Sequence, residues 1–124
     1  MHPLETIINA AYAQREQLSP RNADPEIKQA VAQTLVELEN GVIRVASKID
    51  NEWVTHQWIK KAILLHFKLH ENNVIRAGDY NFYDKVGLRG ANFTNEQFAQ
   101  QQVRIVPPAI ARTGAYIGPN SVLM

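Results

Sequence analysis

The feature of this sequence that most constrains its fold is a six-residue period near its C-terminal end. Ala111 and Ile117 open successive groups of six, and the small residues Ala115 and Ser121 stand fifth in each group. This period is typical of hexapeptide repeats, which build a parallel β-helix from stacked coils of chain. The group 117–122 fits the pattern well, whereas Ala111 stands where an aliphatic residue is usual.

The repeat runs for barely two groups of six before the sequence stops. A single coil cannot bury its apolar face, and stacking on further coils is what stabilises such a solenoid. We therefore expect this chain to be the front part of a longer protein. Residues 107–124 would begin the β-helix after the stiff Pro107-Pro108 junction, and residues 1–106 would form a separate domain.

Apolar residues at helical spacing predict a two-helix hairpin over residues 4–39. The first helix runs from Leu4 to about Gln17. Asp24, followed by proline and glutamate, is expected to cap the start of the second helix. Gly41 follows its end and is expected to adopt a left-handed conformation there.

The period then changes, and residues 42–54 predict short strands or a β-hairpin that turns at Asp50-Asn51. Residues 55–70 form the most apolar helix candidate, and its wide apolar arc places it at the centre of the domain. Trp53 and Trp58 are interpreted as core anchors.

Residues 71–102 predict a loop and a short helix. The stretch 74–91 is expected to be loop with one short strand. Thr94 caps the short helix, with Gln97 as its capping-box partner. A strand over 103–106 completes an α+β fold class.

Composition excludes several classes of function. The net charge of +1, from 13 basic and 12 acidic residues, gives no reason to expect a nucleic-acid or membrane partner. With no cysteine, the chain cannot form disulfides, thiolate metal sites or cysteine nucleophiles. The N-terminus does not resemble a secretory signal, and no stretch is long and apolar enough to span a bilayer. We expect a cytoplasmic protein.

Few side chains suggest chemistry by themselves. His66 and His70 have a zinc-binding spacing, but no third ligand is evident, so no metal is predicted. His56 is expected to cap or pack at the start of the central helix. Lys60 and Lys61 could meet a phosphate, although a solvated helix face is the simpler interpretation. Residues 83–85, Tyr-Asp-Lys, could line a site at the domain junction.

Four segments together resemble tetrahydrodipicolinate N-succinyltransferases, and they lie at residues 41–48, 53–65, 83–86 and 104–108. The second segment is the most specific, because it combines two tryptophans, a histidine and paired lysines. One stretch departs from the family, since Gly87-Leu88-Arg89-Gly90 stands where proline and a basic-aromatic pair would be expected.

This resemblance implies an N-terminal α/β domain, a left-handed parallel β-helix and a homotrimer with active sites between neighbouring β-helices. The implied enzyme transfers a succinyl group from the co-substrate succinyl-CoA to tetrahydrodipicolinate, in lysine and diaminopimelate biosynthesis. It needs no tightly bound cofactor. The CoA-binding coils and the catalytic acid would lie beyond Met124, so the chain alone is expected to be inactive.

Arg104 is the one substrate-binding residue that the resemblance assigns within this chain. A guanidinium can hold a carboxylate of a dicarboxylate substrate through two parallel hydrogen bonds, which lysine cannot reproduce. From its own sequence context, Arg104 would read as a solvated strand residue. The alternative to an enzyme is a non-catalytic interaction or oligomerisation module that retains only this domain.

Overall fold

The computed structural model describes residues 1–124 and has a mixed α+β architecture. Its helices are α1 (Pro3–Ala13), α2 (Pro25–Glu39), α3 (Gln57–Lys68) and α4 (Asn95–Gln101), with a 3₁₀ turn at Arg15–Gln17. Its strands are β1 (Ala46–Ile49), β2 (Glu52–Thr55), β3 (Asn73–Ala77), β4 (Tyr80–Asp84), β5 (Val103–Ile105) and β6 (Ser121–Leu123). The strands pair two by two into three separate sheets.

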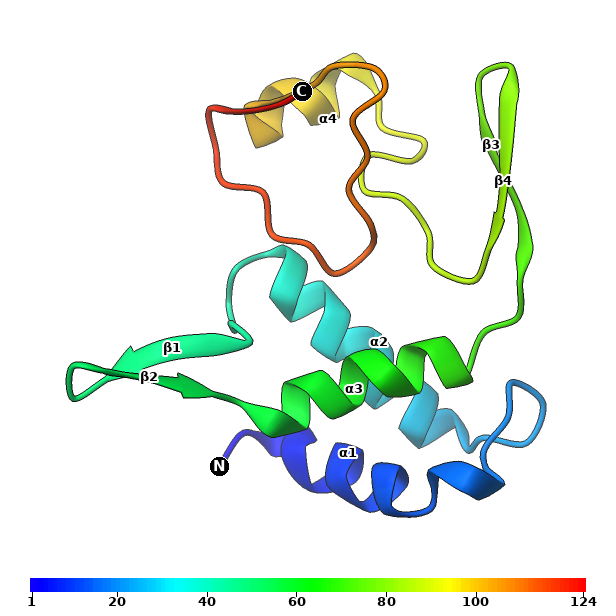
Figure 1. The fold of residues 1–124 in the computed structure, drawn as a ribbon, viewed down its shortest axis with the longest axis vertical. Coiled ribbons are helices and arrows are strands. Elements are labelled where there is room, and N and C mark those ends of the chain that lie inside the picture. Colours follow the sequence, from blue (N-terminus) through cyan, green and yellow to red (C-terminus); the bar gives the residue numbers. More distant parts are fainter.

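The hydrophobic core lies among α1, α2 and α3, which we call the helical unit. Helix α3 packs against both other helices, and Figure 1 shows it lying across them. Its wide apolar arc explains this position, since Ile59, Ala62 and Leu65 are each at most 2% exposed. Ile8 of α1 and Val31 of α2 complete the centre of this core. The sequence pattern therefore placed α3 correctly at the centre.

The helix ends follow the capping signals, with one exception. Thr94 and Gln97 form the predicted capping box at the start of α4. Gly41 has a φ of +71° after α2, as predicted. Asp24 occupies the N-cap position of α2, but its side chain makes no capping hydrogen bond. At α1, Nδ1 of His2 accepts the backbone N–H of Leu4 instead.

Strands β1 and β2 form an antiparallel hairpin that turns at the predicted Asp50-Asn51 pair. Both turn residues have positive φ, which suits a tight two-residue connection between twisted strands. The assignment of Trp53 to the core is wrong, because its side chain is 73% exposed opposite Lys48. No third strand or helix covers that face. Trp58 is buried in the helical core, as predicted.

Strands β3 and β4 form a second hairpin, which corrects the expectation of a loop with one short strand. The hairpin turns at Gly78, where φ is +68°. Consecutive apolar residues point to opposite faces of these strands, as Val74 and Ile75 do, so no clean alternation marks them in the sequence. Both hairpins extend away from the helical unit (Figure 1).

Strands β5 and β6 are parallel, unlike the other two pairs. Val103 pairs with Ser121, eighteen residues later in the chain, and Ile105 pairs with Leu123 in the same register. The chain between these strands descends to the end of α2 before it returns (Figure 1). We call residues 111–116, at the lowest part of this excursion, the tail loop. None of the helices is long and apolar enough to cross a membrane.

Candidate functional site

Arg104 lies in the middle of β5, and its side chain points to the exposed face of the strand. Its neighbours Val103 and Ile105 are half-buried, whereas Arg104 is exposed, as the alternation of side chains along a strand requires. Its partner in the parallel register is Val122 of β6. The guanidinium takes part in none of the ion pairs or side-chain hydrogen bonds of the chain. It is therefore free to bind an anionic ligand.

Arg104 lines a shallow groove of about 440 Å³. The polar side chains that line it are those of Gln102, Asn120 and Ser121. The backbone N–H of Asn120 donates to the carbonyl of Gln102 over 2.6 Å, so the two strands are joined at this end of the groove. Sequence reasoning did not single out Gln102 or Asn120, because their proximity depends on the parallel pairing of β5 with β6.

The candidates Tyr83, Asp84 and Lys85 do not line this groove. The carboxylate of Asp84 instead accepts a hydrogen bond of 2.7 Å from Arg112 in the tail loop. The backbone N–H of Lys85, and then Arg112, hold the pKa of Asp84 below its usual value. Tyr83 is 71% exposed. This segment therefore ties β4 to the tail loop and does not add a group to the Arg104 groove.

His66 on α3 and His70, two residues after the end of that helix, do not line the Arg104 groove. The ring centroids of His66 and His70 are 4.1 Å apart, and Nδ1–H of His70 donates to the carbonyl of His66 over 2.8 Å. Nδ1 of His66 is buried without a hydrogen-bond partner. Burial, and then the charge of His70, lower the pKa of His66 to about 4. No three His, Cys, Asp or Glu side chains of the chain converge as metal ligands.

Two of the other candidates have structural partners. Nε2 of His56 lies 2.6 Å from Oγ of Ser47, so this side chain links the β1–β2 hairpin to the start of α3 and does not cap the helix. Nζ of Lys61 donates to Oδ1 of Asn9 over 2.9 Å and so joins α3 to α1. Lys60 is exposed on the outer face of α3.

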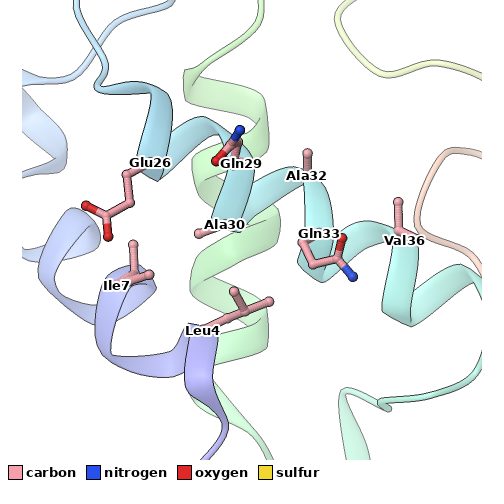
Figure 2. A pocket seen from close by; sticks show the side chains of 8 residues that line it. All are labelled: Leu4, Ile7, Glu26, Gln29, Ala30, Ala32, Gln33 and Val36. Carbon is pink, nitrogen blue, oxygen red and sulfur yellow. The ribbon is translucent and has the colours of Figure 1, made fainter.

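A second groove, of about 510 Å³, lies between α1 and α2. Figure 2 shows Leu4 and Ile7 rising from α1 toward Ala30 of α2, with the polar side chains of Glu26 and Gln33 at its sides. It contains no histidine, arginine or lysine. This groove is a largely apolar surface between two helices, and it holds no cationic group that could bind a dicarboxylate.

The fold and its grooves define an α+β domain that presents an unpaired arginine beside a parallel strand pair. Residues 3–69 match the family model described as "Tetrahydrodipicolinate N-succinyltransferase N-terminal". The match covers more than half of the chain, so the chain belongs to this family.

Curated N-succinyltransferases are also similar to this chain over its whole length. Proteins named 2,3,4,5-tetrahydropyridine-2,6-dicarboxylate N-succinyltransferase are 51% identical in Alteromonas mediterranea and 50% identical in Acinetobacter baylyi, each over 124 residues. The one from Aeromonas salmonicida is 48% identical over the same length. Each alignment covers 100% of this chain and 45% of the relative. The chain thus spans less than half the length of the curated relatives it matches.

Proposed function

We propose that this chain is the N-terminal portion of an enzyme that transfers succinyl from succinyl-CoA to the amino group of tetrahydrodipicolinate. The observation that carries this proposal is the family match over residues 3–69, together with relatives of that name over the whole chain. The reaction would belong to lysine and diaminopimelate biosynthesis. Its location in the cytoplasm stays a prediction.

Arg104 is the residue that we propose to contact the dicarboxylate substrate. Its exposed guanidinium in an open groove supports this role, because none of its N–H groups is engaged by an acid of this chain and all are available to a carboxylate. Gln102, Asn120 and Ser121 line the same groove and offer further hydrogen-bonding groups. This chain would thus supply one wall of the substrate site.

We also propose that the chain between β5 and β6 makes the first coil of a left-handed β-helix, so that β6 stacks on β5 one coil later. The register offset of eighteen residues supports this assignment, because it equals three groups of six. The parallel direction of the pair supports it as well. We propose the domain boundary near residue 106, at the end of β5, where this coil begins. Further coils would stack on β6 and provide the contacts of a homotrimer.

The proposed reaction is acyl transfer from a thioester to an amine. The neutral amine attacks the thioester carbonyl, a tetrahedral oxyanion forms, and the C–S bond breaks to release CoA thiolate. A general base must remove the ammonium proton, and hydrogen-bond donors must meet the oxyanion. No group in the Arg104 groove is a general base, so we propose that the base and the CoA site lie outside this chain. The chain alone should not catalyse the reaction.

A non-catalytic interaction or oligomerisation module is the second candidate function. The exposed aromatic side chains of the two hairpins favour it, since Trp53 is 73% and Tyr80 is 77% exposed. Aromatic residues are enriched at protein interfaces. Such a module would not bind the amino-dicarboxylate.

The direct test joins residues 1–124 to the C-terminal remainder of the Alteromonas mediterranea relative and measures succinyl transfer with Arg104→Lys. The variant keeps the charge but loses the bidentate geometry. We expect KM for tetrahydrodipicolinate to rise by about tenfold, which corresponds to about 1.4 kcal/mol. The matched control is Arg76→Lys, which changes another exposed arginine, on β3. An unchanged KM in the Arg104→Lys enzyme would show that Arg104 is not a substrate contact.

A further inference from the structure

We propose that Glu39 and Arg89 are a positioning pair that fixes the β5–β6 pair, and with it Arg104, on the helical unit. The part of this inference that concerns Arg104 rests on the proposed function. Neither residue lines the groove beside Arg104, so both would act through the backbone that they hold.

Glu39 ties the end of α2 to the tail loop. It is the last residue of α2, and its Oε1 accepts the backbone N–H of Gly114 over 2.9 Å, although the two residues are 75 positions apart. Gly114 has a φ of +97°, and a Cβ there would lie 3.1 Å from Cδ2 of Leu35. The tail loop therefore approaches α2 closely, and a glycine at this point permits the approach.

Arg89 ties the stretch before α4 to the same loop. Its Nε donates to the carbonyl of Ala115 over 3.0 Å, and its Nη1 lies 3.7 Å from Oε2 of Glu39. The side chains are only 12% and 21% exposed, respectively. Backbone hydrogen bonds from Arg89 to Ala111 and from Thr113 to Gly87 hold the two segments side by side. One cation and one carboxylate thus bind three separate parts of the chain.

Arg89 also reaches the inner side of β5. It lines a small enclosed space of about 10 Å³ together with Val103, Ile105 and Ile117. Val103 and Ile105 are the two neighbours of Arg104 whose side chains point inward. Arg89 therefore lies on the side of β5 that carries Val103 and Ile105, whereas Arg104 points to the opposite side. A displacement of Arg89 would therefore change the packing beneath Val103 and Ile105.

The other charged contact of the tail loop is poorly suited to this role. Arg112 and Asp84 are 52% and 40% exposed, and exposed ion pairs contribute little to stability because water and salt screen them. In contrast, the side chains of Arg89 and Glu39 are only 12% and 21% exposed, so removal of one partner leaves the other charge largely shielded from water and without its partner. The chain thus offers a largely shielded and an exposed ion pair that both contact the tail loop, which allows a matched comparison.

The test on the 124-residue chain is amide hydrogen exchange of Glu39→Gln and Arg89→Gln. We expect the amides of Val106, Gly114 and Asn120 to lose at least tenfold protection while those of α3 keep theirs. Arg89→Lys should restore part of the protection, because it keeps the charge. The controls are Arg112→Gln and Glu37→Gln, the second of which removes a carboxylate of the same helix that pairs with His2.

Unchanged protection in both Gln variants would overturn the proposal, and so would equal losses in α3 or in the controls. In the joined enzyme, Glu39→Gln should raise KM for the dicarboxylate about fivefold and leave KM for succinyl-CoA unchanged, a split that a general loss of stability would not produce. If Arg104→Lys has no effect on KM, the proposed function of Arg104 fails, but the exchange result still decides whether Glu39 and Arg89 position β5.

Discussion

At the scale of single residues, several backbone positions carry side chains in the left-handed region. Gln102 has a φ of 55° at the end of α4, where glycine or asparagine is the usual residue. A residue with a Cβ pays an energetic penalty in this region, and asparagine tolerates the region better than glutamine does. Asn120, with a φ of 65°, is therefore less strained than Gln102. Both residues lie at the groove of Arg104.

Replacement of Gln102 by glycine should stabilise the chain by about 1 kcal/mol, because glycine adopts the left-handed conformation without a Cβ clash. The measurement is the free energy of unfolding in urea. Asn120→Gly serves as the matched control and should gain clearly less. A loss of stability in the Gln102→Gly chain would show that its side-chain contacts outweigh the strain of its backbone.

The depressed pKa of His66 predicts that stability depends on pH. Folded His66 titrates near pH 4 and an unfolded histidine near 6.5, so the unfolded chain binds the extra proton between these values. The free energy of unfolding should therefore be highest above pH 6.5 and fall as the pH drops toward 4. Because His66 is partly solvated, we expect this loss to be on the order of 1 kcal/mol.

The measurement is the difference in unfolding free energy between the original chain and His66→Gln across pH 4 to 7. This difference isolates His66 from the carboxylates, which also titrate at the acidic end. A constant difference over the whole range would contradict the lowered pKa.

At the scale of elements, α3 organises the helical unit because apolar residues occupy more than one of its faces. Leu65 is buried in the core of the helical unit and only 1% exposed, whereas the adjacent Leu64 is 50% exposed. The two residues thus differ in burial, although both are leucines on the same helix. This contrast allows the contribution of core packing to be measured with little change in helix propensity.

Leu65→Ala should lower the free energy of unfolding by about 3 kcal/mol, since it removes buried methyl groups and leaves a cavity. Leu64→Ala should lower it by less than about 1 kcal/mol, because exposed substitutions have small effects. Urea unfolding followed by circular dichroism measures both values. Equal losses in the two variants would contradict the central position of α3.

Local signals predicted some elements and not others. The apolar arc of α3, the Asp50-Asn51 turn and the Thr94 cap are local patterns, and each is confirmed. The β3–β4 hairpin was missed because its apolar side chains point to both faces, so the period of two is absent. Trp53 was misplaced because a strand pattern cannot show whether another element covers its face.

At the scale of the whole molecule, the helical unit and the tail meet through contacts between residues far apart in the sequence. The carboxylate of Glu39 holds Gly114, and the ring of Tyr116 lies against Gly41. No local pattern predicts such contacts, so the sequence could not reveal the Glu39–Arg89 pair. Arg104 was singled out only by resemblance to the family, because an arginine on a short strand has no distinctive local signal.

The succinyl-transfer assay on two purified proteins tests the central claim most directly. One is the 124-residue chain, and the other is the same chain joined to the C-terminal remainder of the Alteromonas mediterranea relative. With succinyl-CoA and tetrahydrodipicolinate, we predict that the joined protein releases CoA and that the 124-residue chain does not. Succinyl transfer by the chain alone, or a folded joined protein that releases no CoA, would contradict the account.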